Sequence, residues 1–358
     1  MTARVSNLQE VSWLSGQRPF QFFGPCSAES PEQLRNTASG IKHHFSDVIF
    51  RAGIWKPRTR PNTFEGVGEE GLNWLIDIKN EFGFKVTTEV ANAAHVEACL
   101  KAGIDILWIG ARTTVNPFSV QAIADALEGA DVPVFIKNPL NPDVSLWSGA
   151  VERIAKAGID KIGAIHRGFH LADNKPYRSA PSWDLAVQFK TDHPEIPLIC
   201  DVSHITGNPE LIPHVAQRAF DLDMDGLMIE THIDPKNALS DAQQQVTPNQ
   251  LKNLWDNLVF KSAESKNKEF QSQLEILRSK IDRIDESIVE LLAQRMNISE
   301  EIGLYKKKNQ VTILQLQRWQ EILDRAIKSG KALDLSEPFI SAIYNTIHEE
   351  SIDRQTNS

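Results

Sequence analysis

Four side chains that can bind a metal ion stand beside separate apolar runs of the sequence. Cys26 follows the run F-Q-F-F-G, His204 follows P-L-I-C-D-V, Glu230 ends G-L-M-I-E, and Asp241 lies in the segment after it. One thiol, one imidazole and two carboxylates suit a borderline divalent metal such as Mn²⁺, Fe²⁺, Co²⁺ or Zn²⁺. Spacing alone leaves a second interpretation open, because a single histidine at a strand end is often a hydrogen-bonded packing residue.

Cationic side chains gather at the ends of the same kind of apolar run. They are Arg51, Lys56, Arg58, Arg112, Lys137 and Arg167. The whole chain has a net charge of -9, which argues against nucleic acid or an anionic membrane as the main partner. We therefore expect a local group of Arg and Lys to bind anionic small molecules, since a guanidinium fork matches phosphate and carboxylate.

The elements that must position these groups are short apolar runs separated by amphipathic segments of helical length. The runs cover residues 20–24, 48–53, 85–90, 106–111, 133–137, 161–168, 197–202 and 226–232. Near-continuous apolar strands that alternate with helices are typical of parallel βα units, and eight of them favour a closed TIM (β/α)8 barrel. We predict an α/β barrel over residues 18–258, within a domain of residues 1–260, with its chemistry at the C-terminal strand ends.

A polar segment, K-S-A-E-S-K-N-K-E, follows Phe260 and predicts a linker over residues 261–270. Beyond the linker, apolar residues recur at spacings of three and four, which predicts one long helix. They are Leu274, Leu277, Ile281, Ile284, Ile288, Leu291, Ile298 and Ile302. A second helix is predicted over residues 312–328, with Gly330 as its C-cap, and a third after Ser336. Residues 271–358 are therefore predicted to form a small all-α three-helix domain.

Two cations interrupt the apolar face of the long predicted helix. Arg295 and Lys306 occupy positions that the apolar stripe should bury. Because a buried cation without a partner is costly, these residues require an anionic ligand or a structural carboxylate. A salt-bridged coiled coil remains the alternative from the pattern alone.

Several motifs of the N-terminal domain resemble those of 3-deoxy-D-arabino-heptulosonate 7-phosphate (DAHP) synthase, and most closely its type I beta branch. The motifs are G-P-C-S-A-E-S (24–30), R-A-G-I-W-K-P-R-T (51–59), G-A-R (110–112) and D-V-S-H (201–204). The related octulosonate 8-phosphate synthases have Lys-Ala-Asn-Arg where this chain has Lys-Pro-Arg-Thr. The resemblance therefore favours erythrose 4-phosphate over arabinose 5-phosphate as a substrate.

The resemblance also assigns roles to individual residues. It implies that one divalent metal ion, with Mn²⁺ favoured, is bound by Cys26, His204, Glu230 and Asp241. It implies that phosphoenolpyruvate is held by Arg51, Lys56, Arg112, Lys137 and Arg167, with Lys56 in a catalytic role, and that the sugar phosphate is held by Arg58 and Thr59. The implied reaction condenses phosphoenolpyruvate with erythrose 4-phosphate to give DAHP and phosphate. One departure is N-P-L-N-P-D after Lys137, where many relatives have a shorter Arg-Gly turn.

Residues 271–358 resemble the all-helical chorismate mutases, without a gap in the register of the matching residues. The matching positions are Arg278, Arg295, Lys306, Arg318, Ser351 and Gln355. The resemblance implies that the cations hold the two carboxylates of chorismate during its [3,3] rearrangement to prephenate, with catalytic roles for Arg295, Lys306 and Gln355. It also implies that Arg278 is donated by a second chain. The departures are Trp319, where an acidic residue is usual for the substrate hydroxyl, and Gln315, where an Asp is common.

These observations predict a bifunctional shikimate-pathway enzyme that forms a homodimer through its helical domain, with a higher homo-oligomer left open. The alternative is a DAHP synthase whose helical domain mainly dimerises and senses ligands, with little mutase turnover. A third interpretation, another metal-dependent aldolase with a coiled-coil tail, does not account for Lys-Pro-Arg-Thr. No room is apparent for the N-terminal regulatory domain of some relatives, so prephenate bound to the helical domain is expected to inhibit the barrel.

The N-terminal sequence lacks a secretory signal, and no apolar run approaches the ~18 residues of a membrane span. The three cysteines are too few and too scattered for a disulfide framework. We therefore expect a cytoplasmic enzyme that acts on small molecules, with neither nucleic acid nor a membrane as a partner.

Overall fold

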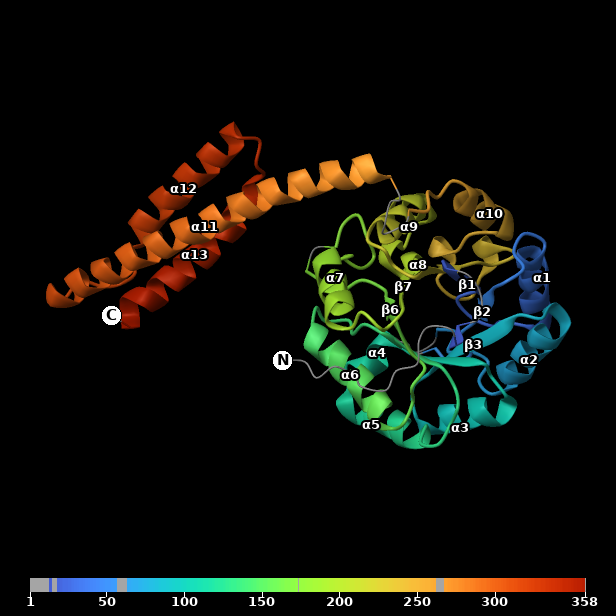
Figure 1. The fold of residues 1–358 in the computed structure, drawn as a ribbon. Coiled ribbons are helices and arrows are strands. Elements are labelled where there is room, and N and C mark those ends of the chain that lie inside the picture. Colours follow the sequence, from blue (N-terminus) through green and yellow to red (C-terminus); the bar gives the residue numbers. More distant parts are fainter. Residues whose placement is uncertain (1–12, 15–17, 57–62, 173, 262–266, 358) are drawn as a thin grey trace. The chain divides into compact units, whose positions relative to one another are not determined.

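The computed structural model describes residues 13, 14, 18–56, 63–172, 174–261 and 267–357 (Figure 1). Packing divides the chain into two compact units, residues 1–263 and residues 264–358. Among the described residues, none of the helices combines the length and the apolar character that a membrane crossing requires.

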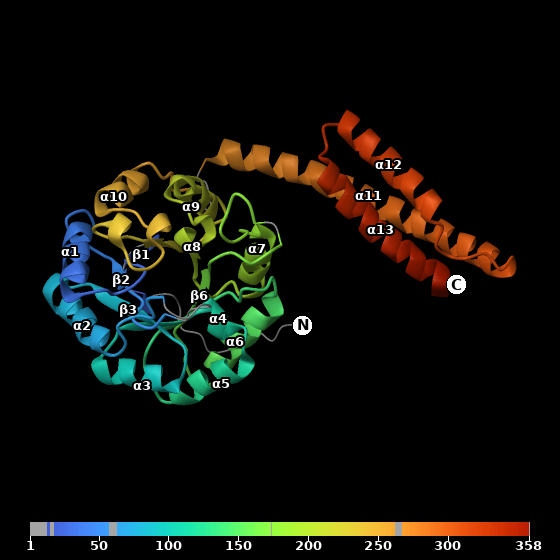
Figure 2. The same ribbon diagram turned by 180° about the vertical axis from the view of Figure 1, so that it is seen from behind.

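The first unit is a closed parallel barrel in which eight strands follow one another in chain order (Figures 1 and 2). The strands are β1 Phe20–Gly24, β2 Ile49–Arg51, β3 Lys85–Val90, β4 Ile106–Ile109, β5 Val134–Lys137, β6 Ile162–His166, β7 Leu198–Asp201 and β8 Gly226–Glu230. The ring closes between β1 and β8, where Phe20 pairs with Gly226 and Gly24 with Glu230. Each strand lies within one of the predicted apolar runs, so the predicted TIM barrel is confirmed.

Helices surround the barrel and cover the outer faces of its strands (Figure 1). They are α1 Pro31–Lys42, α2 Glu70–Phe82, α3 Ala93–Ala102, α5 Pro117–Ala126, α6 Val144–Lys156, α7 Trp183–Asp192, α9 Ile212–Asp221 and α10 Pro248–Asp256. Two short helices instead follow strand ends, α4 Ala111–Thr114 after β4 and α8 Val202–Thr206 after β7, and the 3₁₀ turns are η2 Pro209–Leu211, η3 Pro235–Asn237 and η4 Ala242–Gln244. The first of them shows how the sequence starts a helix. Ser30 precedes α1 and accepts a hydrogen bond from Gln33 N, and Pro31 occupies the first turn.

The inside of the barrel is filled by large side chains, which form a floor beneath the strand ends. Phe22, Trp108 and Phe135 are almost completely buried there, and the rings of Phe22 and Phe135 meet edge to face at 5.1 Å. Gly163 of β6 makes room for this floor, because a Cβ at its position would lie 2.1 Å from the Phe135 ring. The packed interior leaves the C-terminal ends of the strands as the place for polar side chains.

The second unit consists of three helices, α11 Lys268–Lys308, α12 Leu316–Ala332 and α13 Glu337–Asn357. Helix α13 packs against both α11 and α12. The third helix begins where the sequence predicts, directly after Ser336, whose backbone carbonyl accepts from Ile340 N at 3.1 Å. The first helix begins at Lys268, inside the segment predicted to be a linker.

The prediction for the second helix is wrong at both ends. Helix α12 begins at Leu316, four residues after the predicted start, and its C-cap is Leu333 rather than Gly330. Gly330 instead lies inside the helix, where a Cβ would come 2.5 Å from Ile340 Cγ1. This glycine therefore permits the close approach of α12 to α13, and the sequence pattern of a helix end was misleading.

Candidate active sites

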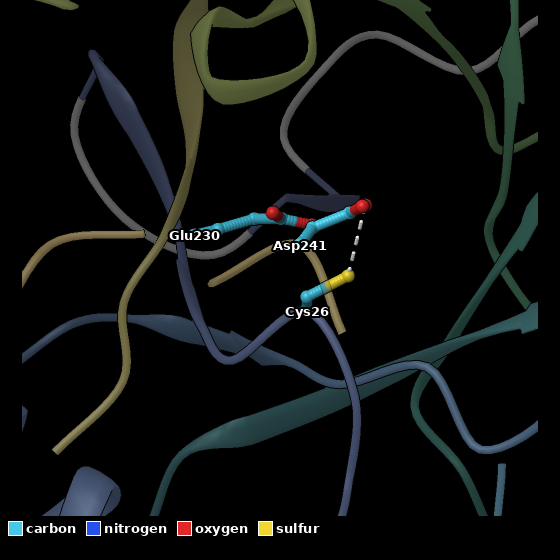
Figure 3. A group of neighbouring side chains, drawn as sticks. All are labelled: Cys26, Glu230 and Asp241. Atoms are coloured by element: carbon cyan, nitrogen blue, oxygen red, sulfur yellow. Dashed lines mark hydrogen bonds between the residues drawn. The ribbon is translucent and has the colours of Figure 1, made fainter. Parts of the chain in front are cut away.

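Three of the four predicted metal ligands come together at the C-terminal mouth of the barrel. Cys26 follows β1, Glu230 ends β8 and Asp241 precedes η4, and one ligand atom of each lies within 4.8 Å of the others (Figure 3). Cys26 Sγ lies 3.5 Å from Asp241 Oδ2, within hydrogen-bonding distance. Cys26 and Glu230 are fully buried, so these groups lie away from bulk solvent.

The fourth predicted ligand, His204, lies beside this group on α8. Its Nε2 is 3.9 Å from Asp241 Oδ2 and its Nδ1 is 3.7 Å from Glu230 Oε1, but the ring is not part of the 4.8 Å cluster. Asp201 at the end of β7 holds the ring, with Oδ2 at 2.9 Å from Nδ1. A carboxylate on one ring nitrogen leaves the other as the ligand atom, which is the usual arrangement around a metal-bound histidine.

The electrostatics of the cluster fit a divalent cation. Burial raises the pKa of Cys26 to about 11, and the negative charge of Glu230 adds to this increase. Burial also raises the pKa of Asp241, but His204 and Arg178 outweigh it and hold that carboxyl well below its usual range. A bound dication stabilises a thiolate and would replace the proton on Cys26. The donor set of thiol, imidazole and carboxylates therefore matches a borderline metal.

Two predicted phosphoenolpyruvate ligands contact this cluster directly. Arg51 Nη1 donates to Glu230 Oε1 at 2.7 Å, and both side chains are buried. Lys56 Nζ lies 3.0 Å from Cys26 Sγ and 3.0 Å from its carbonyl oxygen. Arg58 and Thr59, the predicted sugar-phosphate ligands, lie outside the described residues.

The other predicted cations of the barrel lie around the next strand ends. Lys137 donates to Asp201 at 2.8 Å and is nearly buried. Arg167 is buried at the end of β6, whereas Arg112 on α4 is exposed. Burial lowers the pKa of Arg167 to about 10, and the positive charges of Arg178 and Arg112 contribute. Mutually repelling guanidinium groups at one mouth make a site that favours an anion.

Three residues of the site were not assigned a role from the sequence. Asp201 joins Lys137 to His204 by accepting hydrogen bonds from both. Arg178 pairs with Asp241 at 3.2 Å, and Gln244 donates to Glu230 Oε2 at 2.6 Å. Asp201 stands in the D-V-S-H motif, so its position before His204 was visible, but nothing in the sequence indicates that Arg178 or Gln244 lies at the cluster.

The helical unit brings together four of its six predicted residues, on α11 and α13. Arg295 donates to the Ser351 hydroxyl. Lys306 Nζ donates to Gln355 Oε1 at 3.0 Å and to the Ile313 carbonyl at 2.6 Å. Helix α13 presents Ser351 and Gln355 four residues apart on one face, opposite the two cations of α11.

The two remaining predicted arginines are exposed and make local ion pairs. Arg318 on α12 pairs with Glu321 at 3.2 Å, and Arg278 on α11 pairs with Glu275 at 2.8 Å. Arg278 precedes Arg295 by almost five turns of the same helix, which separates them by about 25 Å at a rise of ~1.5 Å per residue. Arg278 therefore does not reach the other predicted residues within one chain.

The two departures noted in the sequence also have clear positions. Gln315 is the N-cap residue of α12 and makes no capping hydrogen bond through its side chain. Trp319 stacks on the imidazole of His348 on α13, with ring centroids 3.9 Å apart and planes within 6°.

Comparisons with known proteins match both units of the chain. The sequence model of the DAHP synthetase I family matches residues 3–266, and that of chorismate mutase type II matches residues 277–356. The chain belongs to the DAHP synthetase I family. It is a two-domain enzyme in which a barrel of this family precedes a chorismate mutase domain, as the sequence resemblance predicted.

Similar proteins include aldolases with two different names. The chain is 30% identical over 226 residues to the phospho-2-dehydro-3-deoxyheptonate aldolase of Thermotoga maritima. The match covers 62% of this chain and 64% of that protein. The chain is also 30% identical over 266 residues to the 2-dehydro-3-deoxyphosphooctonate aldolase of Helicobacter pylori. That match covers 66% of this chain and 93% of that protein.

A solved structure of DAHP synthase from Thermotoga maritima superposes on the chain with a TM-score of 0.61 and 25% identity, over 72% of this chain and 71% of that chain. A truncated form of the Thermotoga maritima enzyme gives a TM-score of 0.57 and 26% identity, over 66% of this chain and 84% of that chain.

Proposed function

We propose that the chain is a bifunctional enzyme of aromatic biosynthesis, with DAHP synthase activity in residues 1–260 and chorismate mutase activity in residues 271–358, joined by a linker over residues 261–270. The observation that carries the first activity is the convergence of Cys26, Glu230 and Asp241 beside Arg51 and Lys56. The buried cations can bind an anionic substrate. A metal ion held by the neighbouring ligands can polarise an aldehyde.

The cations of the barrel mouth bind phosphoenolpyruvate in this proposal. Arg51, Lys137 and Arg167 are buried and lie at strand ends, so they are held rigidly and are poorly hydrated. Such cations neutralise the carboxylate and phosphate of the substrate and fix the direction of its C3 atom. C3 then attacks the aldehyde of the sugar phosphate, water adds at C2, and phosphate leaves.

Cys26, His204, Glu230 and Asp241 hold a divalent metal ion, with Mn²⁺ the first choice and Fe²⁺, Co²⁺ and Zn²⁺ the others. A metal ion at these residues supplies Lewis acidity toward the carbonyl oxygen of the aldehyde. Lys56 lies 3.0 Å from Cys26 Sγ and is the cation best placed to serve both the metal site and phosphoenolpyruvate.

The sugar phosphate is erythrose 4-phosphate in this proposal, because Lys56 begins the Lys-Pro-Arg-Thr segment. Relatives named for the heptonate and for the octonate product both match the barrel, so the two sugars must be compared directly. The test is a competition between erythrose 4-phosphate and arabinose 5-phosphate with phosphoenolpyruvate and a series of divalent metals. Faster turnover of arabinose 5-phosphate would contradict the proposal.

The helical domain rearranges chorismate to prephenate by electrostatic means alone. Arg295, Arg318 and the partner's Arg278 bind the two carboxylates, and Lys306 with Gln355 meets the ether oxygen as it gains negative charge. Pre-aimed donors of this kind each contribute about 3 to 4 kcal/mol in comparable sites. The supporting observation is that Arg295 and Lys306 of α11 already contact Ser351 and Gln355 of α13.

The active form is a homodimer built through α11. Along its N-terminal half, Leu277, Ile281, Ile284, Ile288 and Leu291 are 49% to 63% exposed, which is unusual for an apolar stripe. A second copy of this helical unit is the occupant that the sequence resemblance implies, and it would supply Arg278 to the neighbouring site.

Trp319 supports a second candidate function, because it stands where an acidic residue for the substrate hydroxyl is usual. In that alternative the helical domain dimerises and binds chorismate or prephenate but turns over little substrate, and bound prephenate inhibits the synthase. Measuring chorismate loss by the full chain distinguishes the two functions. Measuring DAHP formation with and without prephenate tests the feedback separately, and an unchanged rate would contradict it.

A further inference from the structure

Trp319 and His348 form an aromatic pair between α12 and α13. Their rings stack with centroids 3.9 Å apart and planes within 6°, and both side chains are partly buried. A stack of this geometry excludes water from one face of the imidazole and fixes the orientation of the ring. The pair is therefore a rigid, flat surface rather than two freely rotating side chains.

The imidazole of His348 lies close enough to the cations of the mutase site for the positive charges of Arg295 and Lys306 to act on it. His348, Ser351 and Gln355 recur at spacings of three and four on α13, so they share one face of that helix. Ser351 accepts a hydrogen bond from Arg295, and Gln355 accepts one from Lys306 at 3.0 Å. The imidazole thus lies one helical turn from the contact with Arg295.

The surroundings of His348 favour the neutral form of its imidazole. Burial lowers the pKa of His348 and the positive charges of Arg295 and Lys306 lower it further, although Glu349 raises it. A neutral imidazole has one donor and one acceptor nitrogen. Within the described part of the chain, neither ring nitrogen is engaged in a hydrogen bond.

The proposed substrate carries one group that the cations do not suit. Its two carboxylates and its ether oxygen are negative or become negative, and they match Arg295, Lys306 and Arg318. Its ring hydroxyl is neutral, donates one hydrogen bond and can accept others, so it requires a polar partner rather than a counter-charge. A neutral imidazole at the edge of the cation group meets that requirement.

We propose that His348 forms a hydrogen bond with the ring hydroxyl of chorismate and that Trp319 holds the imidazole in position for it. This inference rests on the mutase activity proposed above. His348 is a substrate-binding residue in this view and determines specificity for the hydroxyl, whereas Trp319 is a positioning residue that acts through the stack.

The test compares two substrates on the full chain, chorismate and its analogue that lacks the ring hydroxyl. We expect His348→Leu to lower kcat/KM for chorismate about 10- to 100-fold, because the substitution leaves the ring hydroxyl of the bound substrate without its hydrogen-bond partner. The analogue should lose less than about threefold, because it makes no such bond. His348→Gln keeps a donor and an acceptor, so it should recover part of the loss with chorismate alone.

The role of Trp319 is tested by a pair of substitutions at that position. Trp319→Phe keeps a flat ring against the imidazole, so it should stay close to the unchanged chain in selectivity between the two substrates. Trp319→Leu removes the stack and should reduce selectivity toward that of His348→Leu. Asn345→Ala, on an exposed part of α13, is the matched control, and circular dichroism with thermal unfolding reports whether each variant folds.

Each result decides the inference. An equal loss with both substrates, or no loss with chorismate, would overturn it while leaving the mutase activity intact. An unchanged chain that converts no chorismate would remove the proposed activity and this inference together.

Discussion

At the scale of single residues, the barrel site depends on side chains of opposite charge that pair with one another. Arg51 neutralises Glu230, Lys137 neutralises Asp201, and Arg178 neutralises Asp241. Removing one member of a buried pair leaves its partner unpaired, which is costly. For each substitution in this site, metal binding and ligand binding should therefore be measured together with activity.

Replacement of Cys26 by Ala should abolish metal-dependent DAHP formation and leave chorismate turnover unchanged. The thiol is one of three ligand groups within 4.8 Å of one another, and two carboxylates with one imidazole bind a borderline metal less tightly without it. Metal binding by calorimetry and the two activities check this expectation. Cys99→Ala is the matched control, because Cys99 is a buried thiol on α3. Full synthase activity in Cys26→Ala would contradict the ligand assignment.

Replacement of Asp201 by Asn should weaken metal binding about 10- to 100-fold, the usual effect of losing the carboxylate behind a ligating histidine. Asp201 accepts from His204 Nδ1 and also pairs with Lys137. The substitution should also raise KM for phosphoenolpyruvate, because Lys137 loses the carboxylate that fixes the position of its ammonium group. Calorimetric titration with Mn²⁺ and steady-state kinetics measure the two effects. An unchanged affinity for the metal would show that His204 does not depend on this carboxylate.

At the scale of the elements, the packing of α12 on α13 depends on one glycine. Gly330→Ala should destabilise the helical unit by about 1 to 3 kcal/mol, since a Cβ would lie 2.5 Å from Ile340 Cγ1. The matched control is Gly149→Ala on α6, where no atom lies within 4 Å of the added Cβ. Alanine should stabilise that helix by roughly 0.5 to 1 kcal/mol. Thermal unfolding of both variants measures the difference, and equal stability would contradict the packing role of Gly330.

Much of the barrel was predictable because its strands are continuous apolar runs that end in polar residues. Their places relative to those runs made Cys26, Glu230 and Asp241 candidate ligands, and the resemblance to DAHP synthases implied that they bind a metal. The end of α12 was not predictable, because a glycine serves either to end a helix or to admit a neighbouring side chain, and only the approach of Ile340 distinguishes the two. Arg178 and Gln244 were missed for a related reason, since contacts between distant loops leave no periodic pattern in the sequence.

At the scale of the whole molecule, the 41-residue helix α11 carries Arg278 at one end and Arg295 with Lys306 at the other. If each mutase site takes Arg278 from a second chain, two inactive variants should restore each other. Co-expressed Arg278→Ala and Arg295→Ala chains should recover about a quarter of the activity of the unchanged chain. Half of the dimers are mixed, and one of the two sites in each mixed dimer is complete. Chorismate turnover of the mixture tests this, and no recovery would show that the sites are not shared.

The floor of the barrel has a consequence for the order of events in the synthase. Phe22, Trp108 and Phe135 close the interior below the strand ends, and Arg51 and Lys137 lie 5.0 Å and 5.5 Å from the Trp108 ring. Among the described residues, this packing leaves the C-terminal side of the barrel as the route to Arg51 and Lys137. If phosphoenolpyruvate binds to these deepest cations, as proposed, we expect it to bind before the sugar phosphate and to leave after it.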